Sequence, residues 1–313
     1  MKNIFFISLT IITFNSFSQS IDIVSWNLKE IFSEEDISNR STDFQSFGDD
    51  LSPDILLLQE YTDGSLMEGI GNAMGLTDYF HASSNFVTGG TGRHGSFETG
   101  VLSKYPISRV IEFDISTNGG LGDAEEIEMV ETIKGYTSNS GTGRGFLWVE
   151  IECLNLVVIP VHLKSSVGRT GNDDKENAFK RERVAIAIAN FVSQAKILYP
   201  HYTFIVAGDF NVGHADSKKN GTKLDEDCYE DCSDSDDGYD DTHAIFEAGI
   251  VNGLTMKNLL KWTDATTYER DFGSGPIDNI FVDGDDKENF SQGVISDKLY
   301  NSDHFPIYTT LKY

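Results

Sequence analysis

The feature that most constrains the fold is a series of short apolar runs, each the length of one β-strand, that recurs along the chain. Several are apolar almost throughout, as expected of strands buried on both faces. Turn residues bound the runs, and helical or loop segments separate them. This pattern predicts β-sheets flanked by helices rather than an all-β sandwich. The runs occupy residues 21–26, 55–59, 99–103, 146–152, 156–161, 204–207, 279–282 and 306–311.

Two of the intervening segments are predicted to be helices. In residues 174–198, apolar side chains recur at helical spacing, Asp173 or Asp174 can cap the start, and Pro200 follows the end. A second helix is predicted over residues 40–51, with Phe44 and Phe47 turned inward. No internal repeat or Pro-rich linker divides the chain, so we expect one domain over residues 19–313.

The N-terminal residues have the pattern of a secretory signal peptide. Lys2 precedes an apolar run at residues 4–14 that is too short to span a bilayer, and Ser16 and Ser18 suit a cleavage site. We therefore expect a signal peptide over residues 1–18, a secreted or periplasmic protein, and no membrane insertion after cleavage. The alternative is an apolar N-terminal strand.

The chain is strongly acidic, with a formal net charge of −26 at pH 7. Such a surface repels polyanions at long range, which by itself disfavours DNA or RNA as a substrate. Local cations and bound metal ions can nevertheless reverse the field inside one cleft. Acidity also keeps a secreted protein soluble.

Two stretches are predicted to be surface insertions, at residues 116–143 and at about 213–241. The second ends in an acidic tract at residues 225–241. This tract could bind a structural Ca²⁺, but it lacks EF-hand spacing, and a solvated run of charge is the favoured interpretation. Cys228 and Cys232 could form a small-loop disulfide in an oxidising compartment. Cys153 lies in an apolar run and is interpreted as a buried free thiol.

Polar residues suited to catalysis lie at the ends of the predicted strands. A Gly-Asp-Phe-Asn turn or a Ser-Asp-His segment alone is more often structural than catalytic. A full set in fixed order, each member next to an apolar run, predicts one active site in the loops that leave the sheets. The set comprises Asn27, Glu60, His162, Asp209, Asn211, Asp278, Asp303 and His304.

These residues lie in motifs through which the sequence resembles the endonuclease/exonuclease/phosphatase superfamily, typified by deoxyribonuclease I. The resemblance extends over nearly the whole chain after the signal segment, and it implies an α+β fold: a four-layer sandwich of two packed mixed β-sheets flanked by helices. The matching motifs are Trp26-Asn27, Leu58-Gln59-Glu60, Gly100-Val101-Leu102-Ser103, His162-Leu163-Lys164-Ser165, Gly208-Asp209-Phe210-Asn211, Ile277-Asp278-Asn279-Ile280-Phe281 and Ser302-Asp303-His304.

The resemblance also implies a metal site and its chemistry. Oxygen atoms of Glu60, Asp303 and Asn27 would hold Mg²⁺ or Mn²⁺, which prefer such ligands. Asp209 would lie beside the attacking water, and Asn211 beside a non-bridging phosphate oxygen.

The same resemblance implies two His–carboxylate pairs. His304, oriented by Asp278, is the candidate general base. His162, paired with Glu98, would stabilise the transition state or protonate the leaving group. The sequence leaves the division of acid and base between the histidines open.

Three cations are candidates for binding substrate phosphate. Arg144 matches a phosphate-binding arginine of the deoxyribonucleases, whereas Lys164 and Lys29 are weaker candidates. Lys29 stands where apurinic-endonuclease relatives have an acidic metal ligand, which favours the deoxyribonucleases. Arg93 stands at the position of a minor-groove arginine, but Ser96 replaces the tyrosine that stacks beside it, so duplex-groove recognition is in doubt.

The predicted function is a secreted, divalent-metal-dependent phosphodiesterase, a nuclease that cleaves DNA or RNA by in-line attack of water. The alternative is a sphingomyelinase, phospholipase-C-type or other phosphate-ester hydrolase, although the sequence has no Trp- or Phe-rich loop for a membrane. A non-catalytic binding protein would require losses among the polar set, and none is visible. We expect nucleic acid as substrate, a monomer, and no stable protein partner.

Overall fold

A computed structural model describes residues 20–86, 97–114, 125–128, 144–165, 172–214, 239–260, 266–269, 275–284 and 286–312. Within these residues the strands form two mixed sheets. The first sheet has the order β12-β13-β1-β2-β4-β3 and consists of β1 (Ser20–Ile31), β2 (Ile55–Tyr61), β3 (Phe80–Ser83), β4 (Glu98–Ser103), β12 (Val294–Ile295) and β13 (Ile307–Lys312). The second has the order β10-β11-β9-β8-β7-β5-β6 and consists of β5 (Arg109–Asp114), β6 (Glu125–Glu128), β7 (Phe146–Ile151), β8 (Leu156–His162), β9 (Thr203–Asp209), β10 (Lys257–Asn258) and β11 (Asp278–Asp283).

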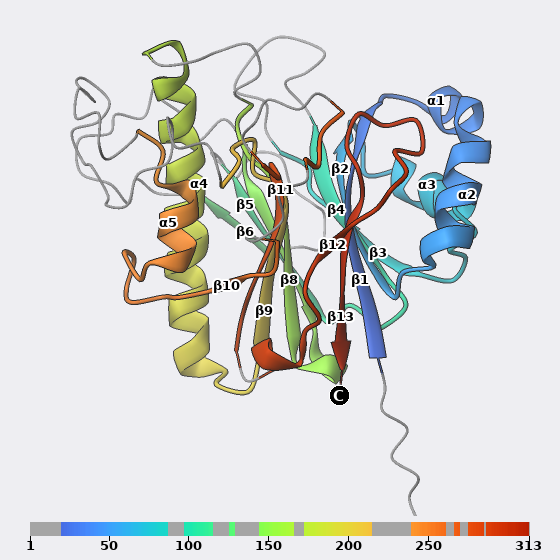
Figure 1. Ribbon diagram of the computed structural model, residues 1–313. Helices are drawn as coiled ribbons and strands as arrows, with labels where there is room; N and C mark the ends of the chain where they lie inside the picture. Colours follow the sequence, from blue (N-terminus) through green and yellow to red (C-terminus); the bar gives the residue numbers. More distant parts are fainter. Residues whose placement is uncertain are drawn as a thin grey trace, which may run out of the picture.

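Each sheet is built around a parallel pair of fully or largely buried strands. β1 pairs with β2 in the first sheet, and β8 pairs with β9 in the second. Antiparallel neighbours lie on both sides of each pair. The carboxyl ends of these four central strands therefore lie at the same end of the sandwich, at the top in Figure 1.

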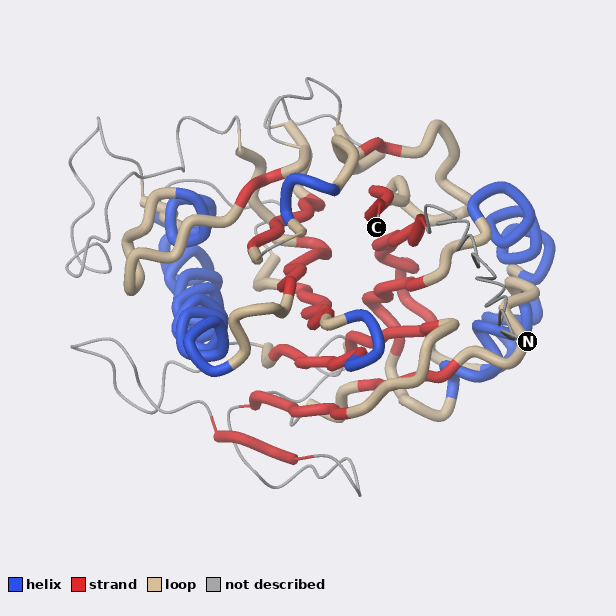
Figure 2. The backbone as a smooth tube through the Cα atoms, turned by 90° about the horizontal axis from the view of Figure 1, so that it is seen from below, coloured by secondary structure: helices blue, strands red, loops and turns tan. Residues whose placement is uncertain are grey.

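Helices cover the outer face of each sheet, and the two inner faces pack against one another (Figures 1 and 2). Separate apolar clusters fill the space between the sheets and the space under each helical layer. The first sheet is covered by α1 (Glu34–Asn39), α2 (Ser41–Leu51) and α3 (Leu66–Ala73), and the second by α4 (Asn172–Leu198) and α5 (Thr242–Glu247). The predicted four-layer α+β sandwich is thus confirmed.

All eight predicted strands and both predicted helices are present in the structure. The strands that the sequence did not predict are short or lie toward the sheet edges: β3, β5, β6, β10 and β12. Edge strands are buried on fewer sides, so they need no continuous apolar run. None of the helices in the described ranges combines the length and hydropathy that a membrane span requires.

The prediction that Cys153 is buried is wrong. Cys153 is exposed, because it lies in a 3₁₀ turn (Glu152–Leu154) that connects β7 to β8 rather than in a strand. The predicted signal peptide, Arg93, Ser96, Cys228, Cys232 and residues 225–238 of the acidic tract lie outside the described residues.

Candidate active site

Two irregularities in the first sheet bring Asn27 and Glu60 into the site. The β1–β2 register shifts between Asn27 and Ile31, where Lys29 (φ 56°) and Glu30 (φ 57°) are left-handed. The β2–β4 register shifts between Gln59 and Tyr61, and the intervening Glu60 is left-handed as well (φ 66°). A bulge of this kind turns one side chain away from the regular alternation of the strand.

The second sheet contributes His162 and Asp209 as direct neighbours in the parallel register of β8 and β9. Gly208 allows this approach: its φ is 145°, and a Cβ atom there would lie 2.0 Å from the Val161 carbonyl oxygen. Beyond the strand, Asp209 Oδ1 accepts from the Asn211 backbone N–H at 2.8 Å. This bond closes the Gly-Asp-Phe-Asn turn, in which Asn211 adopts a left-handed conformation that asparagine tolerates (φ 56°).

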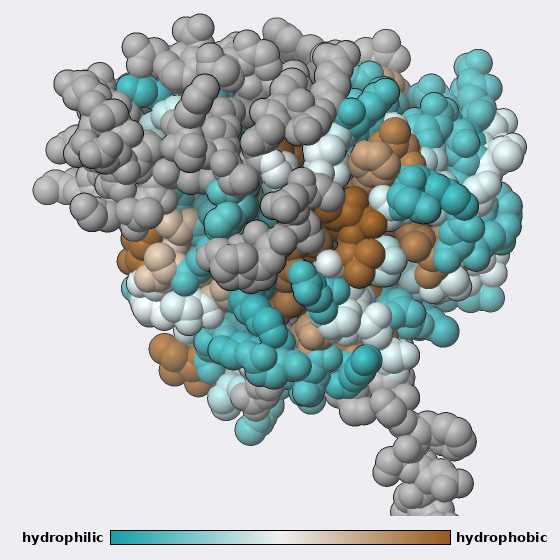
Figure 3. Space-filling model, in the orientation of Figure 1, coloured by the Kyte–Doolittle hydropathy of each residue, from teal (hydrophilic) through white to brown (hydrophobic). Residues whose placement is uncertain are grey.

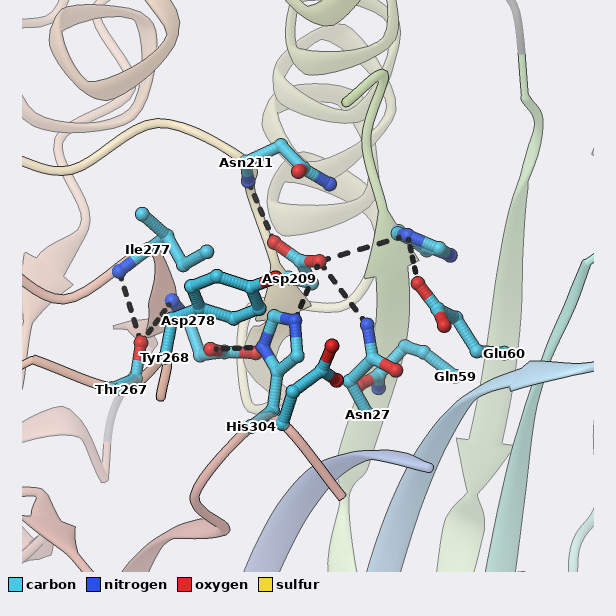
Figure 4. A network of polar contacts seen from close by, with 12 residues as sticks. Asn27, Gln59, Glu60, Asp209, Asn211, Thr267, Tyr268, Ile277, Asp278 and His304 are labelled. Carbon is cyan, nitrogen blue, oxygen red and sulfur yellow. Dashed lines mark hydrogen bonds and ion pairs between the residues drawn. The ribbon is translucent and has the colours of Figure 1, made fainter. Parts of the chain in front are cut away.

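A His–carboxylate pair completes the site. His304 Nδ1 lies 2.8 Å from Asp278 Oδ2. The backbone N–H of Asp278 donates to Thr267 Oγ1 at 2.9 Å, and the Tyr268 ring packs against the His304 imidazole with centroids 4.9 Å apart (Figure 4). Sequence reasoning missed Thr267 and Tyr268, because they lie in no predicted strand and reach His304 through a single isolated bridge.

Asp209 lies at the centre of the assembled site, as Figure 4 shows. Its Oδ2 atom is 3.2 Å from Asn27 Nδ2, 3.6 Å from His162 Nε2 and 3.7 Å from His304 Nε2. His162 Nε2 is also 3.3 Å from Glu60 Oε1. Side chains from both sheets, distant in sequence, thus converge on one carboxylate.

Burial raises the pKa of both central carboxyl groups. The pKa of Asp209 is raised to about 7, first by desolvation and further by the negative charges of Asp278 and Glu60, against the opposing effect of His304. Desolvation also raises the pKa of Glu60, against the effect of a hydrogen bond from Asn27. A carboxyl group with a pKa near neutral is suited to accept and release a proton.

The pKa values of the two histidines are shifted in opposite directions. Burial, followed by the positive charge of Arg144, holds the pKa of His162 well below its usual value. Burial also disfavours the charged form of His304, but the carboxylates of Asp278 and Asp209 outweigh it and raise the pKa of His304 to about 10. At neutral pH, therefore, His162 is neutral and His304 is an imidazolium.

The expected hydrogen bond between Glu98 and His162 is not formed. His162 Nδ1 is buried and has no hydrogen-bond partner within the described part of the chain. Glu98 Oε2 instead accepts from Ser84 Oγ at 2.6 Å and from the Phe86 backbone N–H at 3.0 Å. The carboxylate thus orders the chain that follows β3, a contact that the sequence could not show.

The remaining predicted residues surround this centre. Asp303 Oδ2 lies 3.8 Å from Lys29 Nζ. Arg144 donates from Nη1 to the carbonyls of His162 (3.3 Å) and Leu163 (2.8 Å), and Asn211 Nδ2 donates to the same Leu163 carbonyl at 3.0 Å. The carbonyl of Lys164 accepts from Arg181 Nη1 at 2.9 Å. Arg144 is therefore partly a structural residue that holds the loop after His162.

The side chains fit a divalent cation. In the described residues, ligand atoms of two groups, Glu60–His162–Asp209 and Asp209–Asp278–His304, lie within 4.8 Å of one another. Glu60 and Asp209 are desolvated, and their carboxylates repel each other when both are charged. A hard cation bound between them would offset this repulsion and the cost of desolvation. Of the predicted ligands, Glu60 and Asn27 line this centre, whereas Asp303 lies beside Lys29 and belongs to neither group.

A sequence comparison identifies the family. The profile of the Endonuclease/Exonuclease/phosphatase family matches residues 12–304. The chain belongs to this family. Enzymes of the Endonuclease/Exonuclease/phosphatase family use divalent metal ions, in agreement with the side chains at the site. No curated protein sequence matches the chain significantly.

Solved structures share the fold at low sequence identity. A 3'-5' exonuclease (NExo) from Neisseria meningitidis aligns with a TM-score of 0.58 and 16% identity over 94% of this chain and 100% of that one. The AP endonuclease LMAP from Leishmania major has a TM-score of 0.61 and 11% identity over 94% and 88% of the two chains. TDP2 from C. elegans has a TM-score of 0.52 and 15% identity over 94% and 75%. The family member described here thus has the fold of phosphate-ester hydrolases.

Proposed function

We propose that this protein is a divalent-metal-dependent phosphodiesterase that cleaves nucleic acid. The observation that carries the proposal is the convergence of Asn27, Glu60, His162 and His304 on Asp209 at the ends of the central strands. Oxygen ligands, a protonated imidazole and a carboxyl group with a pKa near neutral are the parts that in-line hydrolysis of a phosphate ester requires.

Each of these side chains has a distinct proposed task. Glu60 and Asn27, with Asp303 at the rim, would hold Mg²⁺ or Mn²⁺, which when bound neutralises charge on the phosphoryl oxygens. Asp209 is the proposed acceptor of the proton of the attacking water, because its Oδ2 atom lies within 3.7 Å of both imidazoles at the centre of the site. Asn211 orients a non-bridging oxygen.

The charge states of the histidines divide their tasks. His304 is an imidazolium held by Asp278, so its Nε2–H stabilises the phosphoryl charge or protonates the leaving oxygen. His162 is neutral and hydrogen-bonds a substrate oxygen. This assignment gives the role of base to Asp209 instead of His304, the candidate from sequence.

Nucleic acid is the proposed substrate for two reasons. Arg144 and Lys29 provide positive charge beside the acidic centre. Among the structures with this fold, one is a variant of the 3' phosphatase NExo from Neisseria bound to a product DNA hairpin (TM-score 0.58, 15% identity).

We also propose export, which rests on residues 1–18 alone. Mass spectrometry of the protein secreted by its host should find Gln19 at the N-terminus, and an intact residue 1 would contradict it.

The test is a parallel assay of plasmid DNA, RNA and sphingomyelin with Mg²⁺ or Mn²⁺ and with a chelator. We expect metal-dependent cleavage of DNA or RNA. His162→Ala and His304→Ala, purified identically to exclude contaminating nucleases, should each lower kcat by roughly 10²- to 10⁴-fold. Full activity in either variant would refute the site, and hydrolysis of sphingomyelin alone would refute nucleic acid as the substrate.

A further inference from the structure

Two left-handed turns flank the site, and each is next to a predicted metal ligand. Lys29 and Glu30 follow Asn27 at the bulge of β1. Before Asp303, Tyr300 (φ 49°) and Asn301 (φ 63°) are both left-handed, and the Ser302 backbone N–H donates to the Leu299 carbonyl at 3.0 Å. Residues other than glycine adopt such conformations at a cost, and the surrounding contacts must hold them there.

One buried guanidinium connects these two turns. Arg40 Nη1 donates to the Leu28 carbonyl and, at 3.4 Å, to the Lys29 carbonyl. Its Nη2 donates to the Tyr300 carbonyl at 3.3 Å. Arg40, at the junction of α1 and α2, is only 8% exposed, and its guanidinium packs over the Phe44 ring.

The Arg40 guanidinium hydrogen-bonds to backbone carbonyl oxygens rather than pairing with a carboxylate. Among the residues that the structure describes, no carboxylate lies within ion-pair distance of this guanidinium. Burial accordingly lowers the pKa of Arg40, and Asp43 and Asp303 offset this effect through space. A planar fork of donors can satisfy carbonyls on two segments at once, which the single ammonium of lysine cannot do.

Smaller contacts join the same two segments. Ser302 Oγ donates to the Asn27 carbonyl at 2.7 Å and accepts from the His304 backbone N–H at 3.1 Å. Trp26 Nε1 donates to the His304 carbonyl at 3.2 Å. The bonds from Ser302 to Asn27 and from Trp26 to His304 thus add to the Arg40 bridge in tying the end of β1 to the segment that carries Asp303 and His304.

We propose that Arg40 is a positioning residue: by bridging the two left-handed turns, it fixes Asn27 at the centre of the proposed cation site relative to the segment that carries Asp303 at its rim. The inference rests on the proposed metal site, and it concerns the affinity of that site rather than the substrate. Arg40 touches neither the ion nor the phosphate ester.

The sign of the effect separates positioning from electrostatics. Arg40→Met removes a positive charge near the site, so a purely electrostatic role predicts tighter binding of a cation. Positioning predicts weaker binding. Arg40→Lys retains the charge but loses the fork, so positioning predicts weaker binding here too, whereas electrostatics predicts no change.

The experiment measures the Kd for Mn²⁺ of the purified full chain by electron paramagnetic resonance of the free ion, together with the melting temperature in chelator. We expect both Arg40 variants to weaken Mn²⁺ binding by roughly tenfold or more, as loss of residues that orient metal ligands usually does. Their nuclease activity should recover at raised metal concentration. Ser302→Ala, which removes one parallel link, should weaken binding less.

Two control variants distinguish loss of positioning from a general loss of stability or of surface charge. Lys298→Met removes an exposed cation that contacts Asp50 and the Tyr300 ring, and it should leave the Mn²⁺ affinity unchanged. Ile188→Ala, in the core under α4, should lower the melting temperature without weakening Mn²⁺ binding. If Arg40→Met and Arg40→Lys melt lower but bind Mn²⁺ like the wild type, the positioning role is wrong; should Arg40→Met not fold, Arg40→Lys and Ser302→Ala decide.

The outcome is also independent of the proposed substrate. Wild-type protein that binds Mn²⁺ but cleaves no nucleic acid would refute the proposed nuclease while leaving the Arg40 comparison intact. Wild-type protein that binds no Mn²⁺ would refute the positioning role together with the metal site.

Discussion

At the scale of single residues, two neighbouring carboxylates give His304 a positive charge that its residue type alone does not fix. Asp278 and Asp209 raise the pKa of His304 to about 10, although burial opposes this. At His162, which is buried to a similar degree, burial and then the positive charge of Arg144 lower the pKa well below its usual value. Similar side chains thus acquire different chemistry from their neighbours.

Asp278→Asn should lower the pKa of His304 toward its ordinary value of 6.5. A raised folded-state pKa stabilises the protein below the unfolded pKa, and this stability is lost as the pH rises through the folded pKa. The wild type should therefore exceed the variant in free energy of unfolding by roughly 3 kcal/mol at pH 6, and the difference should vanish above pH 10.

The measurement is NMR titration of the His304 ring protons in metal-free protein, with chemical denaturation at several pH values. The His162 resonances serve as the internal control, because their titration should change little. An unchanged His304 titration in the variant would show that Asp278 does not hold the proton.

At the scale of elements, the site depends on strands that depart from regularity. The bulge of β2 places Glu60 in a left-handed conformation with a desolvated carboxylate, so both backbone and charge are unfavourable there. Local strain and uncompensated charge of this kind are typical of functional sites. We expect this strain and charge to lower the stability of the metal-free protein, and metal binding to offset the loss.

Glu60→Gln should therefore stabilise the metal-free protein and abolish metal-dependent activity. The folded-state pKa of Glu60 is raised, so the wild type loses stability as the pH rises above 4.5, and the variant is spared this loss. We expect a gain of about 1 kcal/mol at pH 7 and none at pH 4.

Urea denaturation in chelator at both pH values measures this gain. Glu288→Gln removes an exposed carboxylate from an ion pair with Lys257, and it should leave the stability nearly unchanged, because solvent-exposed ion pairs contribute little. A Glu60→Gln protein less stable than the wild type at pH 7 would contradict the proposed strain.

At the scale of the whole molecule, a strongly acidic chain carries a site proposed for a polyanion. Hydrophilic residues dominate the lower and right-hand parts of the face in Figure 3, and the formal charge of the chain is −26. Long-range repulsion should slow the approach of nucleic acid, whereas Arg144 and Lys29 act only within the cleft.

Added salt should therefore accelerate the reaction in the range of low ionic strength, because it screens this repulsion. Raising the ionic strength from about 10 mM to about 100 mM should increase kcat/KM for DNA by roughly threefold, because the Debye length falls from about 30 Å to about 10 Å. A small monoanionic phosphodiester is the control and should change little. A monotonic fall in kcat/KM with salt, as for basic nucleic-acid-binding proteins, would contradict this expectation.

The sequence by itself determined the long buried strands of the two sheets and the polar residues at their ends, but not the short strands and those toward the sheet edges. Strands buried on both faces need continuous apolar runs, and a bonded turn such as Asp209–Asn211 forms within a few residues, so both leave local patterns. Glu60, His162 and His304 could therefore be named before any contact between them was known.

Only the tertiary structure decided how these residues interact. Burial and neighbouring charges determine which histidine carries the proton, and they depend on every element packed around the site. The partners of Glu98 follow from how the chain after β3 folds back, and Arg40 reaches Tyr300 across 260 residues of sequence. Contacts between segments so far apart leave no periodicity or spacing in one sequence, because only the packing of the two sheets and their helices brings them together.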